Sequence, residues 1–419
     1  MSKTMSEKIL AKAAGVSSVN VGDIFWVDIH KAMMDDLLGP RIEIDDRMKE
    51  MGVGVWDPDR VIIISDHYTP PANERQANIV KFTRDWATEH NVKSYYEFDG
   101  PCHQVMVDKG HVLPGEVIVG TDSHTCTYGA LASFATGVGS TEMAGVLATG
   151  QTWLRVPATI KIEWNGKLAP LVMAKDVSLK SIGVIGHSGA TYQTMEYCGT
   201  TINEMPMDER LCLTNMVVEA GAKAGLIAYD QITAEYLRTL GITGDFSWVN
   251  SDPDADYIAK YTFDASTLVP QVACPHEVDN VVDISTLEPV KIDQAYLGSC
   301  TGGRYLDLKY SADLLKGKKI AKGLRLLVSP ASRDIYNLCL KDGILETLAE
   351  AGATILPASC GACLGLHSGI LAEGEVCVSA TNRNFLGRMG AKSAKVYLAS
   401  PVSVAAAAVA GKIVDPRSI

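Results

Sequence analysis

The sequence predicts an α/β fold built on parallel sheets. Five short apolar runs have the length and composition of buried strands, and each ends in cysteine or polar residues. Residues 61–64 are four consecutive branched residues, typical of a strand that is covered on both faces, as in a parallel sheet. Residues 73–90 predict a helix that crosses back over that sheet. A chain of 419 residues is long enough for two or three domains.

Polar or cysteine residues directly follow the carboxyl end of each predicted strand. Residues 60–65 lead into Asp66 and His67, and residues 116–120 lead into the stretch Thr-Asp-Ser-His. Residues 375–379 and the runs before Cys300 and Cys360 repeat this construction. Ligands of open α/β sheets bind at the carboxyl ends of the strands. Five such cases predict that the sheets face one shared cleft.

The other elements are predicted from local patterns. Ser6 is the expected N-cap of a first helix that stops at Gly15. The small residues at 129–137 predict a tightly packed helix, because a phosphate loop would need a following Gly-Lys-Ser or Gly-Lys-Thr. We also expect a strand at 19–28, an antiparallel excursion at 155–180, a helix at 213–224, a polar connection at 245–290 and a buried helix at 405–410.

The composition excludes several classes of protein. The net charge of −11 argues against a general nucleic-acid binder, which usually shows a basic patch or a high pI. No stretch approaches ~18 consecutive apolar residues, so no membrane helix is expected. The N-terminus lacks the apolar core of a signal peptide. The 10 cysteines are scattered, unlike a disulfide framework, and a reducing cytoplasm is the expected location.

Three of the cysteines have the arrangement of metal ligands. Cys360 and Cys363 form a C-x2-C pair, and Cys300 follows another predicted strand. Thiolates suit zinc or iron–sulfur clusters, both of which ordinarily take four protein ligands. Three thiolates on a 4Fe-4S cluster would leave one iron open, as a catalytic Lewis acid requires. The alternative is that all three are buried core cysteines.

Several motifs carry a family resemblance. They are Gly298-Ser299-Cys300-Thr301, Cys360-Gly361-Ala362-Cys363-Leu364-Gly365, Thr121-Asp122-Ser123-His124-Thr125-Cys126-Thr127 and Thr381-Asn382-Arg383-Asn384-Phe385. Together they resemble the aconitase superfamily, with the large subunits of the 3-isopropylmalate dehydratase and homoaconitase type as the nearest members. The resemblance runs from Glu7 to Pro401 in the family's order.

The resemblance implies a three-domain α/β/α assembly around an iron–sulfur cleft, without the swivel domain. Residues 1–285 would be an N-terminal region of two interleaved α/β domains, and residues 286–419 a C-terminal α/β domain that carries the cysteines. The superfamily's catalytic serine lies in a Gly-Ser-Ser-Arg motif, and this sequence has none. A small subunit with the swivel domain is therefore the implied partner, in a heterodimer or heterotetramer that is active only when assembled.

The resemblance also assigns site residues. The implied cofactor is one 4Fe-4S cluster on Cys300, Cys360 and Cys363. The implied proton-transferring pairs are Asp66 with His67, Asp122 with His103, and Glu196 with His124. Arg383, Arg388 and Ser123 would bind a small carboxylate substrate, since guanidinium groups match carboxylates bidentately. The alternative for each histidine is a buried core residue whose nitrogens are hydrogen-bonded without any catalytic role. The alternative for each arginine is a position on a solvent-exposed surface.

Three positions depart from the family pattern. Leu37 and Leu38 stand where the family places hydrogen-bonding side chains beside the substrate, and Gly302 stands where it usually has asparagine. The expected activity is a hydro-lyase acting on a hydroxy di- or tricarboxylate, with 3-isopropylmalate first. Homoaconitate, citramalate or maleate, and 2,3-dimethylmalate remain open, as do a non-catalytic iron–sulfur or zinc sensor and an RNA-binding regulator.

Overall fold

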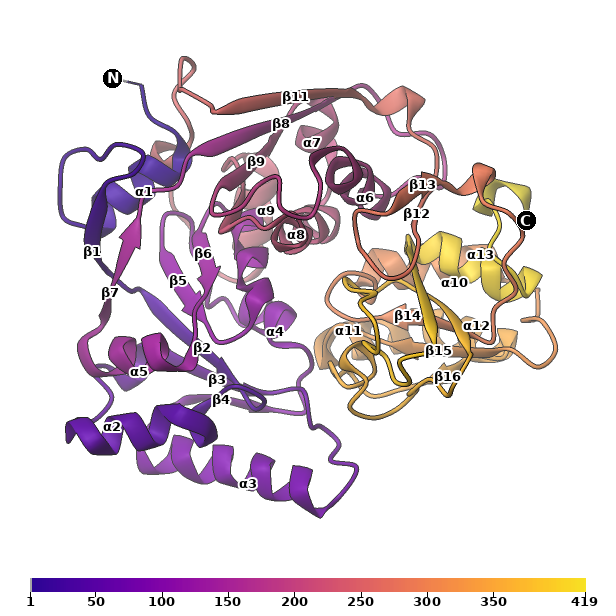
Figure 1. The fold of residues 1–419 in the computed structure, drawn as a ribbon, viewed down its shortest axis with the longest axis horizontal. Coiled ribbons are helices and arrows are strands. Elements are labelled where there is room, and N and C mark those ends of the chain that lie inside the picture. Colours follow the sequence, from indigo (N-terminus) through magenta and orange to yellow (C-terminus); the bar gives the residue numbers. More distant parts are fainter. Residues whose placement is uncertain (1) are drawn as a thin grey trace.

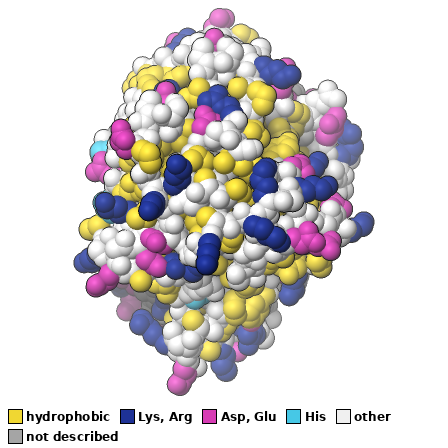
Figure 2. Space-filling view, turned by 90° about the vertical axis from the view of Figure 1, so that its right-hand side faces the viewer, with side chains coloured by type: hydrophobic (Ala, Val, Ile, Leu, Met, Phe, Trp, Pro, Cys, Tyr) yellow, Lys and Arg dark blue, Asp and Glu magenta, His cyan; other side chains and the backbone are white. Residues whose placement is uncertain are grey.

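The computed structural model describes residues 2–419 and shows an N-terminal region beside a C-terminal lobe (Figure 1). Parallel strands dominate three of its four sheets, as the sequence predicts. Figure 2 shows the face of the molecule on the C-terminal side, where basic, acidic and hydrophobic side chains are interspersed. Within residues 2–419, no helix is both long and apolar enough to cross a membrane.

The first sheet has five parallel strands in the order β4-β3-β2-β5-β6. They are β2 (Lys31–Asp35), β3 (Val61–Ser65), β4 (Ser94–Glu97), β5 (Val117–Gly120) and β6 (Phe134–Gly137). All of β3 is buried, which explains its branched sequence. The accompanying helices are α1 (Met5–Ala13), α2 (Asp45–Met51), α3 (Glu74–Glu89), α4 (Cys102–Asp108) and α5 (Ser140–Thr149).

Helix α3 confirms the prediction for residues 73–90, because Asn73 caps it by accepting from the backbone N–H of Gln76. Two other predictions for this part of the chain, the cap at Ser6 and the helix at 129–137, are wrong. The cap of α1 is Thr4, not Ser6, because Thr4 and Glu7 form a capping box. Residues 129–137 are no helix: the 3-10 segment η3 (Ser123–Leu131) ends there, and β6 follows because residues 134–137 pair with β5.

The second sheet has four parallel strands in the order β10-β9-β8-β11. They are β8 (Thr159–Asn165), β9 (Thr194–Cys198), β10 (Ala224–Ile227) and β11 (Ala259–Asp264), with helices α6 (Ala174–Ile185), α7 (Thr200–Glu204), α8 (Met207–Met216) and α9 (Gln231–Thr239). The antiparallel excursion predicted at 155–180 is therefore wrong. Antiparallel pairing occurs just before it, between β1 (Ile24–Asp28) and β7 (Gln151–Arg155). The helix predicted at 213–224 corresponds to the end of α8 and the 3-10 segment η4 (Val217–Ala220).

The C-terminal sheet has seven strands in the order β13-β12-β18-β17-β14-β15-β16. They are β12 (Gln271–Ala273), β13 (Val281–Asp283), β14 (Gln294–Gly298), β15 (Arg325–Ser329), β16 (Thr354–Ile355), β17 (Val376–Ser379) and β18 (Lys395–Ala399). Its helices are α10 (Tyr305–Leu315), α11 (Arg333–Lys341), α12 (Ile344–Ala351) and the predicted buried helix α13 (Pro401–Ala410). Because β12 and β13 belong to this sheet, it begins before residue 286, and the domain division at that residue stays a prediction.

A shared hydrophobic core joins the two parts of the chain. Ile160 and Val177, from the second sheet and α6, belong to the same buried cluster as Tyr296 and Leu327 of the C-terminal sheet. Burial of apolar area contributes roughly 25 cal/mol per Å2, so a continuous core favours one fixed arrangement of the lobes. This arrangement brings the carboxyl ends of β3, β5, β14 and β17 toward one another.

Candidate functional site

His67 and Asp66 form a buried pair directly after β3. His67 Nδ1 lies 2.7 Å from Asp66 Oδ1. The Asp36 carboxylate, at the end of β2, accepts the backbone N–H groups of His67 at 2.9 Å and Tyr68 at 3.0 Å. Burial alone would lower the pKa of His67, but the carboxylates of Asp66 and Asp36 raise that pKa well above its usual value. The carboxylates of Asp66 and Asp36 therefore favour the protonated form of His67, and Asp36 is a partner that sequence reasoning missed.

A second pair joins α4 to the segment that follows β5. His103 Nε2 lies 2.9 Å from Asp122 Oδ1, and the same oxygen accepts the backbone N–H of His124 at 2.7 Å. His124 Nδ1 lies 3.2 Å away, and the two imidazole rings are 5.9 Å apart. Burial would raise the pKa of Asp122, but the two histidines lower it well below its usual value. Asp122 is therefore an ionised carboxylate shared by both rings.

The third pairing differs from the prediction. His124 Nε2 lies 2.8 Å from Glu219 Oε1, and Glu219 also accepts from Arg383 Nε at 2.7 Å. Glu196, the predicted partner, instead accepts from Ser251 and Tyr257 at 2.8 and 2.9 Å. The reason is topological: Glu196 lies inside strand β9, whereas η4 carries Glu219 to the ring. No local sequence signal distinguishes these two glutamates.

The predicted substrate-binding residues line a common pocket of about 450 Å3. Ser123, Arg383 and Arg388 face it together with Asp122. Leu37 and Leu38 also line this pocket, so they lie beside the predicted substrate-binding residues. Leu364 adds a further apolar wall. The pocket contains two charged residues that the sequence did not single out, Lys223 and Glu142. Arg388 is fixed by donation from its Nε to the carbonyl oxygen of Cys363, at 3.1 Å.

The three predicted ligand cysteines converge beside the histidines. Asn382 contacts two of them, with Oδ1 3.4 Å from Cys363 Sγ and Nδ2 3.9 Å from Cys300 Sγ. The Cys360 backbone N–H donates to the carbonyl oxygen of Asp66 at 2.9 Å. A hydrogen bond between the thiols of Cys360 and Cys363 raises the pKa of Cys360 and lowers that of Cys363. The loop that carries Cys360 and Cys363 is therefore hydrogen-bonded directly to the segment that carries Asp66 and His67.

The surroundings of these thiols suit an anionic metal cluster. Asn215 donates its side-chain N–H to Cys300 Sγ at 3.3 Å, and such donors stabilise thiolates and tune cluster potentials. The departure at Gly302 also has a physical reason, since a Cβ there would lie 2.3 Å from the Cβ of Ala380. Three converging thiols with amide donors fit an iron–sulfur cluster better than a closed zinc site, which needs a fourth ligand.

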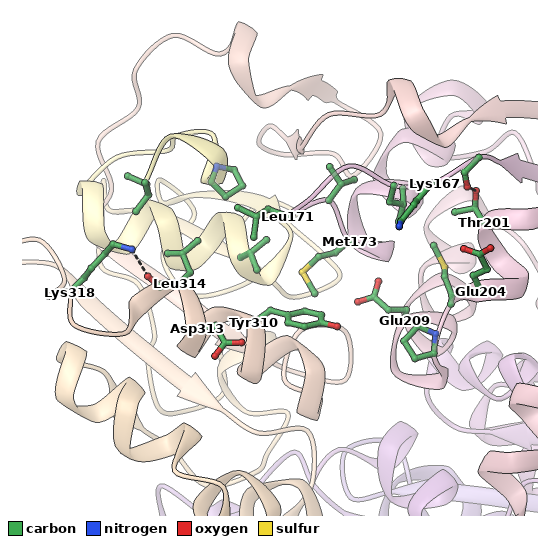
Figure 3. Close-up of a pocket in the computed structure, with 18 residues that line it drawn as sticks. Lys167, Leu171, Met173, Thr201, Glu204, Glu209, Tyr310, Asp313, Leu314 and Lys318 are labelled. Atoms are coloured by element: carbon green, nitrogen blue, oxygen red, sulfur yellow. Dashed lines mark hydrogen bonds between the residues drawn. The ribbon is translucent and has the colours of Figure 1, made fainter.

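A separate cavity of about 770 Å3 lies between α8 and α10 (Figure 3). Its wall is largely apolar and includes Met173 and Leu171, while Glu209 and Tyr310 come from opposite sides. Burial raises the pKa of Glu209 to about 8. None of the histidines, arginines or cysteines described above lines this cavity, so it is distinct from the candidate site.

Comparisons with known proteins agree with this geometry. Residues 56–411 match the model of the aconitase family (aconitate hydratase). The chain is 50% identical to the 3-isopropylmalate dehydratase large subunit 1 of Methanopyrus kandleri, over 100% of this chain and 99% of that protein. It is 46% identical to a probable methanogen homoaconitase large subunit of Methanothermobacter thermautotrophicus, over 99% and 97%.

A solved structure shares the fold. The crystal structure of Thermococcus kodakaraensis aconitase X superposes with a TM-score of 0.52 at 13% identity, over 86% of this chain and 84% of that one. At this identity the likeness concerns the arrangement of sheets and helices. The family match and the full-length relatives go further, because they extend over the site residues as well. The chain therefore belongs to the aconitase family, and its full-length relatives are large subunits.

Proposed function

We propose that this chain is the cluster-bearing large subunit of a 4Fe-4S hydro-lyase that acts on a hydroxy di- or tricarboxylic acid. The observation that carries the proposal is the meeting of three groups at one site. Buried histidine–carboxylate pairs, two arginines and three cysteine thiols lie on linked segments, most of them at strand ends and one at the start of α4. A sensor would need the thiols but has no use for arginines that face a pocket. The expected three-domain assembly around a cluster cleft is part of this proposal.

Cys300, Cys360 and Cys363 would hold the cluster. When bound there, a cluster with one open iron supplies a Lewis acid that polarises the carbon–oxygen bond to be broken. Asn215 and Asn382 keep the Cys300 sulfur in place by hydrogen bonding. The protein's own contribution is then to bind the carboxylates, hold the protons and exclude water.

The three histidines have different roles. His67 Nδ1 is engaged by Asp66, which leaves Nε2 as the nitrogen that can hold a proton for a leaving hydroxyl group. His103 Nε2 is engaged by Asp122, and its buried Nδ1 has no partner within residues 2–419. Both nitrogens of His124 are occupied, by Asp122 and Glu219. We therefore assign proton transfer to His67 or His103, and a positioning role to His124.

The arginines supply the carboxylate site. The Nε of each arginine donates a hydrogen bond within the protein: Arg383 to Glu219, and Arg388 to the carbonyl oxygen of Cys363. The other nitrogens of Arg383 have no hydrogen-bond partner among the described residues, whereas the Arg388 guanidinium also interacts with the Cys363 thiol; both guanidinium groups line the pocket. A planar pair of N–H donors matches a carboxylate bidentately, and these contacts fix the orientation of the substrate. The Ser123 hydroxyl lines the same pocket and would add a further contact.

The leading substrate is 3-isopropylmalate. Leu37, Leu38 and Leu364 form an apolar side of the pocket, which suits an alkyl group and leaves a buried carboxylate without a partner. An added methylene in such a pocket is worth only ~1–3 kcal/mol, so the structure gives weak discrimination among 3-isopropylmalate, citramalate, maleate and 2,3-dimethylmalate types.

A second candidate is homoaconitate chemistry. Lys223 adds a third cation to the pocket beside Arg383 and Arg388, and a tricarboxylate offers three anions. Relatives named for either activity match the whole chain. Glu142 lines the pocket as well and would partly neutralise Lys223. The apolar side of the pocket keeps this candidate second.

The proposed partner is a small subunit that carries the swivel domain and the catalytic serine. The experiment is anaerobic reconstitution of the purified chain with iron and sulfide, with and without the cognate small subunit, in the reducing conditions expected of the cytoplasm. Hydration and dehydration of 3-isopropylmalate are then followed by the absorbance of the unsaturated acid. We expect turnover only in the presence of both subunits. Turnover by the large chain alone, or none by the assembled pair on any of these acids, would contradict the proposal.

A further inference from the structure

Lys175 is a buried cation near the start of α6, only 1% exposed. Its ammonium group donates to the carbonyl oxygen of Thr381 at 2.6 Å and to that of Ala380 at 3.3 Å. It also reaches Thr301 Oγ1 at 3.4 Å and Met216 Sδ at 3.5 Å. Every one of these groups is neutral.

No carboxylate within residues 2–419 forms an ion pair with Lys175. The adjacent Asp176 is turned elsewhere, because its carboxylate accepts the backbone N–H groups of Gln271 and Met173. A buried charge without a counter-charge is costly, since carbonyl dipoles replace only part of its hydration. Burial has the largest effect and lowers the pKa of Lys175 overall, and the more distant charges of Cys212, Cys300, Cys363 and Asp307 offset only part of this shift.

The contacts of Lys175 lie next to the proposed cluster ligands. Thr301 follows Cys300 directly, and residues 380–381 precede Asn382, whose amide contacts both Cys300 and Cys363. The hydroxyl of Thr301 donates to the carbonyl oxygen of Ala380 at 2.9 Å, so Lys175 and Thr301 together tie the loop after β14 to the loop after β17. The ammonium group therefore stands at the junction of the two loops.

An anionic cluster would complete this arrangement. An oxidised 4Fe-4S core carries two positive charges and three thiolates carry three negative charges, which leaves one net negative charge. We propose that Lys175 is the buried counter-charge of the cluster, and that it sets the cluster's reduction potential while it joins the two loops. The inference rests on the proposed function, because it requires the cluster on Cys300, Cys360 and Cys363.

The test compares Lys175→Met with Lys180→Met. Methionine has nearly the length of lysine and no charge, and Lys180 lies on the same helix but is partly exposed and paired with Asp283 at 3.4 Å. Both variants are loaded with cluster anaerobically, and the midpoint potential is measured by a redox titration followed by electron paramagnetic resonance. Loss of a positive charge makes reduction harder. We expect the ratio of reduced to oxidised cluster at a fixed potential to fall about tenfold in Lys175→Met, which is a shift of about 59 mV for one electron.

The cluster-free chains provide a second readout. Without the cluster, Lys175 lacks a counter-charge, so Lys175→Met should unfold at the same or a higher urea concentration than the wild type. With the cluster, the variant should gain less stability than the wild type does. Lys175→Gln, which keeps donors but no charge, should behave like Lys175→Met in both readouts.

Two outcomes would overturn the inference. One is a potential in Lys175→Met that equals that of Lys180→Met. The other is an equal loss of stability with and without the cluster, which would show that Lys175 acts only through its hydrogen bonds. If the wild-type chain itself binds no cluster, the proposed function fails and this inference fails with it. Normal loading of the wild type with an unchanged potential in Lys175→Met refutes the inference alone.

Discussion

Replacement of Glu219 by glutamine tests the carboxylate that the structure assigns to His124. Glu219 accepts from His124 Nε2 at 2.8 Å and from Arg383 Nε at 2.7 Å through the same oxygen. Its side chain is 2% exposed, that of His124 is 4% exposed and that of Arg383 is 18% exposed. Glutamine keeps the shape and one acceptor oxygen but removes the charge. The substitution therefore isolates the electrostatic part of the contact.

The expected loss follows from the burial of the group. A hydrogen bond to a charged partner is worth about 1.5–3 kcal/mol, and removing one member of a buried ion pair costs about 3–5 kcal/mol. Because the glutamine oxygen still accepts, we expect Glu219→Gln to lower the free energy of unfolding by about 2–4 kcal/mol. In the assembled enzyme kcat/KM should fall about 100-fold, since His124 and Arg383 both lose their anchor.

The stability difference between the wild type and Glu219→Gln should change with pH in a defined direction. Burial would raise the pKa of Glu219, but His124 and Arg383 lower it below its usual value of 4.5. A lowered folded-state pKa contributes stability above the unfolded-state pKa, and the contribution is lost as the pH falls through the folded-state value. The stability difference between the wild type and Glu219→Gln should therefore be full at neutral pH and shrink below about pH 4.5.

The assay is urea unfolding at several pH values, with kcat/KM of the reconstituted pair. Glu196→Gln is the matched control, because burial raises the pKa of Glu196 and its partners Ser251 and Tyr257 are neutral. A neutral amide should cost little there. A large loss of kcat/KM in Glu196→Gln with little change in Glu219→Gln would refute the assignment of Glu219 as the partner of His124.

Three further predictions follow from the same site. Asp36 accepts backbone N–H groups of the segment that carries His67. Asp36→Asn should therefore lower the free energy of unfolding by about 2 kcal/mol and also lower kcat. An unchanged kcat would contradict this. Leu38→Thr should raise kcat/KM for a tricarboxylate relative to 3-isopropylmalate about tenfold, and an unchanged ratio would show that Leu38 does not face the substrate. Because the pKa of His67 is raised, its ionic contribution to stability is full below about pH 6.5 and is lost as the pH rises through the folded-state pKa, so the difference in urea unfolding between the wild type and His67→Gln should be largest below about pH 6.5 and shrink as the pH rises above it.

Local patterns in the sequence carry much of the fold. The N-cap at Asn73 and the branched run at 61–64 locate α3 and β3, because capping and burial act over a few residues. The cysteines are recognisable because C-x2-C spacing is itself local. The pair Asp66 and His67 is visible for the same reason.

Partners that are distant along the chain could not be predicted in this way. Glu219 reaches His124 because η3 and η4 are brought together by the packing of α8, and Glu196 has an equally suitable sequence context. Lys175 looks like an ordinary residue of an amphipathic helix until its burial is known. The parallel pairing of β8 depends on β9 and β11, which lie about 30 and 100 residues further along the chain.

The measurement that tests the central claim most directly is the iron and sulfide content of anaerobically reconstituted chains. We predict about four irons and four sulfides in the wild type. Cys300→Ser, Cys360→Ser and Cys363→Ser should abolish the cluster, whereas Cys274→Ser should load normally. Exposure to air should convert the wild-type cluster to a three-iron form, because the iron without a protein ligand is held least. Normal iron and sulfide in the Cys360→Ser chain would contradict the account.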